Sequence, residues 1–146
     1  MIPVIKEEIP EIKKQIAEIK DRDPLTERII ACGYKVHSEL GPGFNEKIYH
    51  NALKCALKES ELGYVTEKQY KVIYQDNLVG NLRIDLIIED KVIVEVKALT
   101  GNIPKVFESQ VLSYLKVTGH DVGLLVNFGN KSCQVRRLML GKDSRD

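Results

Sequence analysis

The 146-residue sequence lacks any apolar run that could cross a membrane, because a helical span needs about 20 consecutive apolar residues. Residues 1–15 carry acids among their apolar residues, so they lack the uninterrupted apolar core of a signal peptide. The three cysteines, Cys32, Cys55 and Cys133, are widely spaced and form no CxxC pair, which argues against a disulfide framework or a zinc site. We therefore expect a cytoplasmic protein with no membrane partner.

No charge of one sign dominates the chain, since 22 basic residues stand against 21 acidic ones and the formal net charge is +1. Without a global basic field, any contact with nucleic acid must come from a local patch. Basic residues near the C-terminus are one candidate for such a patch, with solvated surface as the alternative: Lys131, Arg136, Arg137, Lys142 and Arg145.

Residues 1–22 differ from the rest because their isoleucines recur at spacings of 4, 3, 4 and 3, which is typical of an apolar seam on a helix. We expect an N-terminal helical extension over this range, ended by Asp23-Pro24. The seam has two interpretations, packing on the chain's own core or forming a homodimer, and so few heptads do not decide between them.

The remaining sequence predicts one domain over residues 23–141 and a frayed tail over 142–146. Apolar residues at helical spacing predict helices over 25–40, 45–61 and 104–118. Thr26 is expected to cap the first of these helices and Gly63 to close the second. Alternating or continuously apolar segments predict strands over 64–74, 78–88, 92–98, 122–128 and 133–140. This order predicts an α/β fold, with three antiparallel strands, a helix and two further strands in one mixed sheet flanked by helices.

Three charged residues, Asp85, Glu95 and Lys97, interrupt two otherwise apolar predicted strands. Burying an unpaired charge is costly, so these side chains need partners or a bound cation. Two carboxylates and an ammonium group can hold a divalent ion and orient a water molecule beside it. The structural alternative is an ion pair, such as Asp85 with Lys97, that carries no chemistry.

The metal-site hypothesis makes a prediction about strand register. Glu95 and Lys97 are two residues apart on one strand and so point to the same face. Asp85 joins them only if it lies opposite Glu95, which needs a three-residue turn at residues 89–91 or a bulge near the site. A two-residue turn would place the two acids on opposite faces.

Two further motifs occur in the predicted helices that precede and follow these strands. Residues 43–49 read G-x-x-E-x-x-Y at the start of the second predicted helix, and residues 110–114 read Q-x-x-x-Y in the third. In this combination the sequence resembles the GxxExxY proteins of the PD-(D/E)xK nuclease superfamily, in its RecB-nuclease-like branch. The resemblance covers residues 25–140 and implies a restriction-endonuclease-like core. The proline that gives the superfamily motif its name is Ile84 here.

The resemblance implies a role for each matching residue of the two strands. Asp85 and Glu95 correspond to metal-binding carboxylates, and Val96 to a residue whose backbone carbonyl is a further ligand. Lys97 corresponds to the lysine that orients or helps to deprotonate the attacking water. Glu46 corresponds to the helical acid that completes the metal site, although an acid near a helix N-terminus also suits the helix dipole alone.

The remaining motif residues are expected to line the site or to orient its groups: Gln110, Tyr114 and Tyr49. Structural hydrogen bonding is the alternative for Gln110 and Tyr114, and core packing with a hydrogen-bonded hydroxyl is favoured for Tyr49. Among the histidines, His37 is expected to be buried and satisfied rather than near a metal, and His50 and His120 to lie at the surface.

The predicted function is hydrolysis of phosphodiester bonds in nucleic acid, DNA in preference to RNA, with Mg²⁺ or Mn²⁺ as cofactor because hard oxygen ligands favour these ions. The alternative is a nuclease fold with little or no turnover that serves in nucleic-acid binding or protein assembly, since a fold does not determine an activity.

Overall fold

The computed structural model describes residues 23–141, which begin with helix α2 (Pro24–Leu40). The Asp23 side chain caps this helix by accepting a hydrogen bond of 2.7 Å from the backbone N–H of Thr26. The expectation that Thr26 is the cap was therefore wrong by one turn. The Thr26 hydroxyl instead donates to the Asp23 carbonyl, so both side chains fasten the same helix end.

A tight Gly41-Pro42-Gly43 turn connects α2 to helix α3 (Glu46–Glu59). Asn45 caps α3 by accepting a hydrogen bond from the Ile48 N–H. The helix ends two residues before the expected position, because Glu61 rather than Gly63 adopts the positive φ that reverses the chain. Gly63 has another function, since its N–H donates to the Glu89 side chain.

Five strands form one sheet in the order β1-β2-β3-β4-β5. The strands are β1 (Tyr64–Tyr74), β2 (Asn77–Ile88), β3 (Val92–Lys97), β4 (Val122–Asn127) and β5 (Gln134–Met139). Strands β1, β2 and β3 are antiparallel neighbours, as the sequence predicts, and β3 and β4 are parallel because helix α4 (Lys105–Thr118) crosses between them. Strand β5 pairs antiparallel with β4 and forms one edge of the sheet.

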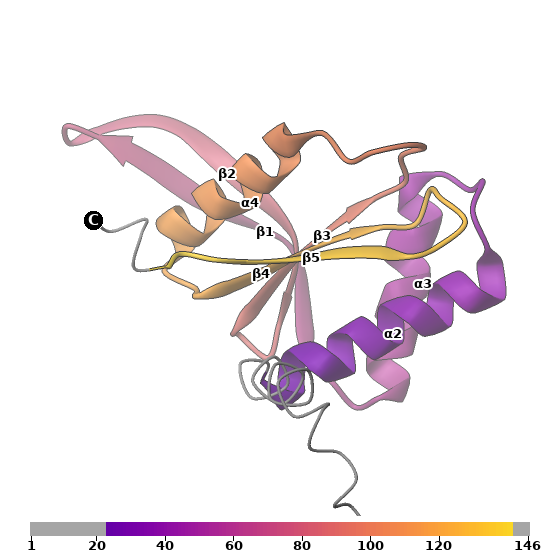
Figure 1. Ribbon diagram of the computed structural model, residues 1–146. Helices are drawn as coiled ribbons and strands as arrows, with labels where there is room; N and C mark the ends of the chain where they lie inside the picture. The colour runs from indigo at the N-terminus through magenta and orange to yellow at the C-terminus, as the bar shows by residue number, and fades with distance from the viewer. Residues whose placement is uncertain (1–22, 142–146) are drawn as a thin grey trace, which may run out of the picture.

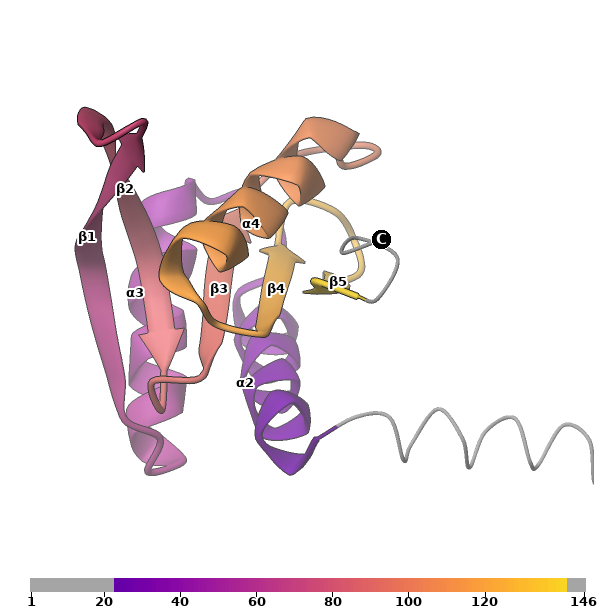
Figure 2. The same cartoon turned by 90° about the vertical axis from the view of Figure 1, so that its left-hand side faces the viewer.

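The helices cover the two faces of the sheet unequally. Helices α2 and α3 lie together on one face and α4 lies alone on the other (Figures 1 and 2). Under α2 and α3 is the larger apolar core, to which β3 contributes Val92, Val94 and Val96. The α4 face has smaller clusters, which include Ile93 of β3 and Leu115 of α4. This arrangement confirms the predicted α/β fold class.

The predictions for residues 1–22 and 142–146 fall outside the described residues, so the helical extension, its dimer seam and the frayed tail stay predictions. Sedimentation of the chain with and without residues 1–22 tests the seam, because an unchanged oligomeric state contradicts it. All three cysteines are free. Within residues 23–141, no helix is long and apolar enough to span a bilayer.

Candidate active site at the diverging ends of two strands

The register between β2 and β3 is the one that the metal-site hypothesis requires. Residues 89–91 form a three-residue turn, and the strands pair Ile88 with Val92 and Leu86 with Val94. The paired residues end at Leu86 and Val94, so Asp85 and Glu95 come next along their strands, where the strands separate. The charge of Asp85 acts on Glu95 there, so the three-residue turn brings the two acids near each other.

Asp85 lies where the two strands stop pairing. Its Oδ2 accepts a hydrogen bond of 3.3 Å from the Val96 N–H, across the gap between the strands. The carboxylate of Asp85 is therefore fixed by the backbone of β3 and held beside Glu95. The ion pair of Asp85 with Lys97, which was the structural alternative to a metal site, is not formed among the described residues, where Lys97 pairs with Glu95.

Glu95 and Lys97 form a buried pair on the α4 side of β3. The distance from Lys97 Nζ to Glu95 Oε2 is 3.6 Å, and the two side chains are 15% and 8% exposed. The Lys97 ammonium also lies 4.4 Å from the ring centre of Phe107 on α4, in a cation–π contact. The other oxygen of the carboxylate, Glu95 Oε1, is buried and has no hydrogen-bond partner among residues 23–141.

The carboxylate of Glu95 is destabilised by its surroundings. Burial raises the pKa of Glu95 from 4.5 to about 8, and the charge of Asp85 contributes to the rise. The Lys97 charge opposes this shift, while Glu46 adds to it. Two acids that repel each other and one unpartnered carboxylate oxygen are what a bound cation would stabilise.

Helix α4 carries Tyr114 on a half-buried side and Gln110 on an exposed side. Burial raises the pKa of the Tyr114 hydroxyl, and the charges of Glu95 and Asp85, which are near enough to act on it, raise it further. Gln110 is exposed, one helical turn away on the same helix. The structure therefore brings Tyr114 to the acidic cluster and leaves the Gln110 side chain at the surface.

Tyr49 lies in the core under α2 and α3, where its side chain is fully buried. Its ring stacks on Phe128 with ring centres 4.8 Å apart. Its hydroxyl donates to the Gly41 carbonyl at 2.5 Å and accepts from the Phe44 N–H at 3.2 Å. These contacts agree with the packing interpretation of Tyr49, and they fix the turn that leads into Glu46.

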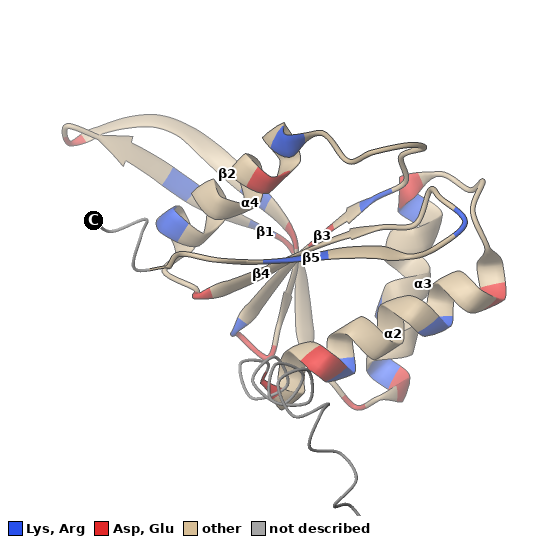
Figure 3. Ribbon diagram, viewed as in Figure 1, with Lys and Arg blue, Asp and Glu red and all other residues tan. Residues whose placement is uncertain are grey.

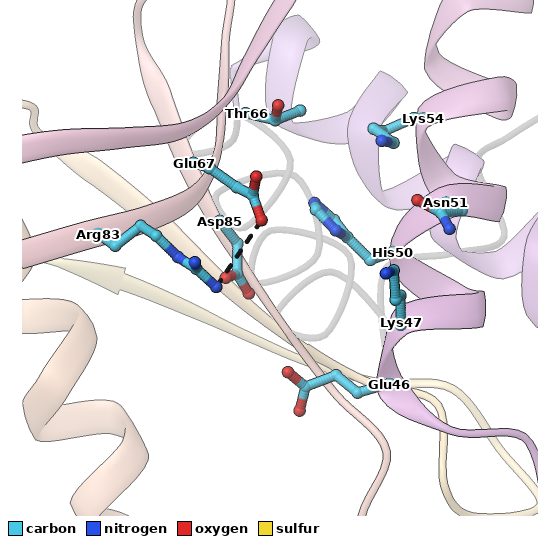
Figure 4. Close-up of a pocket in the computed structure, with 9 residues that line it drawn as sticks. All are labelled: Glu46, Lys47, His50, Asn51, Lys54, Thr66, Glu67, Arg83 and Asp85. Atoms are coloured by element: carbon cyan, nitrogen blue, oxygen red, sulfur yellow. Dashed lines mark ion pairs between the residues drawn. The ribbon is translucent and has the colours of Figure 1, made fainter.

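Glu46 lines a polar cavity of about 360 Å³ between α3 and the strands β1 and β2, and Asp85 lies in the opposite wall of this cavity. Figure 4 shows the Glu46 side chain pointing toward the side on which Asp85 lies. His50 lines the same cavity and is half-buried, with its Nε2 shielded from solvent, so it lies only partly at the surface where the sequence placed it. Its spacing of four residues from Glu46 is the sequence signal that could have found it.

The two other histidines have partners. His37 is 8% exposed and its Nε2 lies 2.7 Å from the Asn130 carbonyl oxygen, which confirms the prediction of a buried, satisfied histidine. His120 was expected at the surface, but its side chain is only 14% exposed and lies 3.8 Å from Asp90. Neither histidine lines the cavity that contains Asp85.

Comparison with known proteins agrees with this geometry. The family model for the PD-(D/E)XK nuclease superfamily matches residues 23–138, which is most of the chain. The chain belongs to the PD-(D/E)XK nuclease superfamily. No curated protein matches it.

One solved structure with the same fold is the crystal structure of SSO0001, with a TM-score of 0.52 and 21% sequence identity. The similarity covers 64% of this chain and 48% of that one, so this chain spans about half the length of SSO0001. At this identity, the likeness concerns the fold alone.

The acids of this PD-(D/E)XK chain suit a hard divalent cation in their chemistry. Asp85, Glu95 and Glu46 offer carboxylate oxygens, and the first and last are close enough for their charges to act on Glu95. As the side chains stand, residues 23–141 contain no cluster of three or more acidic, histidine or cysteine side chains placed to hold a metal. The unpartnered Glu95 Oε1 is the observation that favours a cation beside the acid pair.

Two residues that the sequence did not indicate fix the chain just after Lys97. The fully buried Asn127 side chain accepts from the Leu99 N–H at 2.7 Å and donates to the Leu99 carbonyl at 2.9 Å. A Cβ on Gly129 would lie 2.3 Å from that carbonyl oxygen, so only glycine fits there. The end of β3 that carries Lys97 is therefore anchored to β4 from outside the motif.

Basic and acidic residues are intermixed along the described helices and strands (Figure 3). Two members of the C-terminal basic group have acidic neighbours, since Arg136 lies 3.9 Å from Glu108 and Arg137 lies 3.7 Å from Asp23. These pairings favour the interpretation of that group as ordinary surface.

Proposed function

We propose that this chain hydrolyses phosphodiester bonds in nucleic acid, DNA in preference to RNA, with Mg²⁺ or Mn²⁺ as its cofactor. The observation that carries the proposal is the buried Glu95 carboxylate, which stands beside Asp85 and Lys97 with one oxygen unpartnered. Within the superfamily, the motifs of residues 43–49 and 110–114 favour assignment to the GxxExxY proteins and the RecB-nuclease-like branch.

Asp85 and Glu95 would hold the cation, with Glu46 and the backbone carbonyl of Val96 completing its shell. A bound divalent cation neutralises charge on the phosphate and lowers the pKa of water. In the reaction, the oxygen of water bonds to phosphorus while the ester P–O bond to the leaving oxygen breaks. The water loses one proton to the surrounding solvent, and the leaving oxygen takes one up.

Lys97 has the clearest role among the chain's own groups. Its ammonium is held between Glu95 and the Phe107 ring, so it is a fixed positive charge at the acid pair. A fixed charge next to the phosphate stabilises the negative charge that develops in the transition state. Tyr114 on α4 borders the same acids and is positioned to contact substrate or orient Lys97, while Gln110 would act only on substrate that extends over α4.

The experiment compares cleavage of plasmid and of single-stranded DNA and RNA, with and without Mg²⁺ or Mn²⁺. We expect metal-dependent cleavage by the wild type and a loss of about 100-fold or more for Glu95→Gln and Lys97→Ala. Lys91→Ala is the matched control, since Lys91 is exposed in the turn between β2 and β3. Equal rates in all four proteins would contradict the assignment, and metal-dependent binding without cleavage would favour a binding or assembly module instead.

A further inference from the structure

One wall of the cavity beside Asp85 carries basic and polar groups that the proposed reaction does not use. Lys47, Asn51 and Lys54 project from α3 at intervals of four and three residues, so they share one face of the helix. Figure 4 shows that they line α3 across the cavity from the strand residues Glu67 and Asp85. The helical wall therefore carries two lysines and one acid, Glu46, and the strand wall carries two acids and Arg83.

The two lysines of the helical wall, Lys47 and Lys54, make no ion pair with an acidic side chain among residues 23–141. On the opposite wall, Arg83 lies 3.7 Å from Glu67, so those two charges offset each other. The two lysines are thus available to an anionic ligand.

A third group on this wall lacks a partner. His50 Nε2 is shielded from solvent and makes no hydrogen bond within the described part of the chain. A buried polar atom left unpaired costs about 1–3 kcal/mol, so a ligand that pairs with it is favoured by a similar amount. His50 lies between Lys47 and Lys54 in sequence and lines the same cavity.

We propose that this cavity binds the sugar–phosphate backbone of one nucleic-acid strand beside the bond to be cut, with Lys47 and Lys54 on its phosphates and His50 and Asn51 hydrogen-bonded to it. The position of the cut rests on the proposed function, because Asp85 and Glu46 lie in the same cavity. Seven residues at about 1.5 Å each separate the two lysines by about 10 Å along α3, so they contact different phosphates.

The size of the cavity suits a single strand better than a duplex. Its volume of about 360 Å³ is at the low end of the roughly 300–1,000 Å³ range of small-ligand pockets. It can seat a nucleotide but not a duplex. Contacts to phosphate carry no sequence information, so binding at this wall is independent of base sequence.

The test measures binding of labelled single-stranded oligonucleotides of different sequence, and of the matching duplex, by fluorescence anisotropy in EDTA at several salt concentrations. Each phosphate contact on a single strand contributes about 0.7 to the slope of log affinity against log salt. We expect Lys47→Ala/Lys54→Ala to reduce this slope by about 1.4, whatever the sequence. The control Lys91→Ala should leave the slope unchanged.

His50→Phe separates hydrogen bonding from charge. It keeps a ring of similar shape and removes the ring nitrogens, so we expect about five-fold weaker binding with an unchanged salt slope, as for the loss of one hydrogen bond of about 1 kcal/mol. Circular dichroism of each variant confirms folding, and the exposed Asn51→Asp serves as a second charge-changing variant, which should weaken binding and lower the slope.

Different results would overturn the binding of a strand in this cavity and the nuclease activity. If the wild type cuts but the double lysine variant keeps the slope of Lys91→Ala, or if duplex binds as tightly as single strand, the cavity proposal is overturned and the nuclease proposal stands. If binding depends on both lysines but no metal ion yields cleavage, the cavity proposal stands and the nuclease proposal falls. No measurable binding of any oligonucleotide overturns the cavity proposal.

Discussion

The two faces of strand β3 differ in what they bury. Toward α2 and α3 the strand presents Val92, Val94 and Val96, which belong to one continuous apolar core. Toward α4 it presents Ile93, then Glu95 and Lys97, in a face covered by a single helix. One face contributes stability through burial of apolar surface, and the other places charge where burial raises its free energy.

This difference shows where the fold carries an energetic cost that a ligand could offset. Within the apolar core, the polar Thr26, Asn127 and Tyr49 side chains are hydrogen-bonded. On the α4 face, Glu95 has an unpartnered oxygen, a like-charged neighbour and a raised pKa. Four predictions test whether the two faces really behave differently, from the largest expected effect to the smallest.

Glu95→Gln should remove most of the pH dependence of stability in metal-free buffer. The pKa of Glu95 is about 8 in the folded chain, against an ordinary value of 4.5. The contribution of Glu95 to stability is therefore most favourable below pH 4.5, where its carboxyl group is protonated in both the folded and the unfolded chain. Stability is lost as the pH rises from 4.5 to 8, and above 8 the loss is complete. At about 1.4 kcal/mol per pKa unit, the loss has an upper limit on the order of 5 kcal/mol.

The measurement is urea denaturation of both proteins in EDTA at pH 5 and pH 9. We expect the free energy of unfolding of the wild type to fall between these pH values by several kcal/mol more than that of the variant. Parallel pH profiles would show that the Glu95 carboxylate is not destabilised by its site.

Leu124→Ala on the apolar face should lower the free energy of unfolding by about 2–5 kcal/mol, because Leu124 is fully buried and its loss leaves a cavity. In contrast with Glu95→Gln, the loss should be the same at pH 5 and pH 9. Denaturation at the two pH values checks this, and a loss that varies with pH would show that the two faces are coupled.

Mg²⁺ or Mn²⁺ should stabilise the wild type by about 2.7 kcal/mol when present at 100 times its dissociation constant, because the cation binds the folded acid pair. The rise in Tm on adding metal should disappear in Asp85→Asn and persist in Leu124→Ala. A rise that survives in Asp85→Asn would place the cation elsewhere.

Tyr49→Phe should cost about 1 kcal/mol of stability, since it removes the hydroxyl that bonds Gly41 and Phe44 but keeps the stacked ring. It should leave the metal-induced rise in Tm unchanged, because Tyr49 acts on the turn and not on the acids. Thermal unfolding with and without Mg²⁺ makes the comparison, and a lost metal response would give Tyr49 a role in the site.

The sequence was sufficient to predict the element order, the mixed sheet and the spacing of Asp85, Glu95 and Lys97, because the period of apolar residues and the length of a turn are local properties. It misplaced the cap of α2 and the end of α3, where neighbouring polar residues compete for the same backbone groups. It did not identify His50, Asn127 or Phe107, whose roles come from neighbours distant in sequence.

The local sequence therefore determined which residues share a face of a strand. The tertiary structure decided the free-energy cost of burying the charges on that face. The pKa of Glu95 depends on how deeply α4 buries its carboxylate and on how near β2 brings Asp85. The spacing of residues in the sequence gives neither the burial nor the separation. Electrostatic free energy depends on position in three dimensions, because both the separation of charges and their access to water are set by packing.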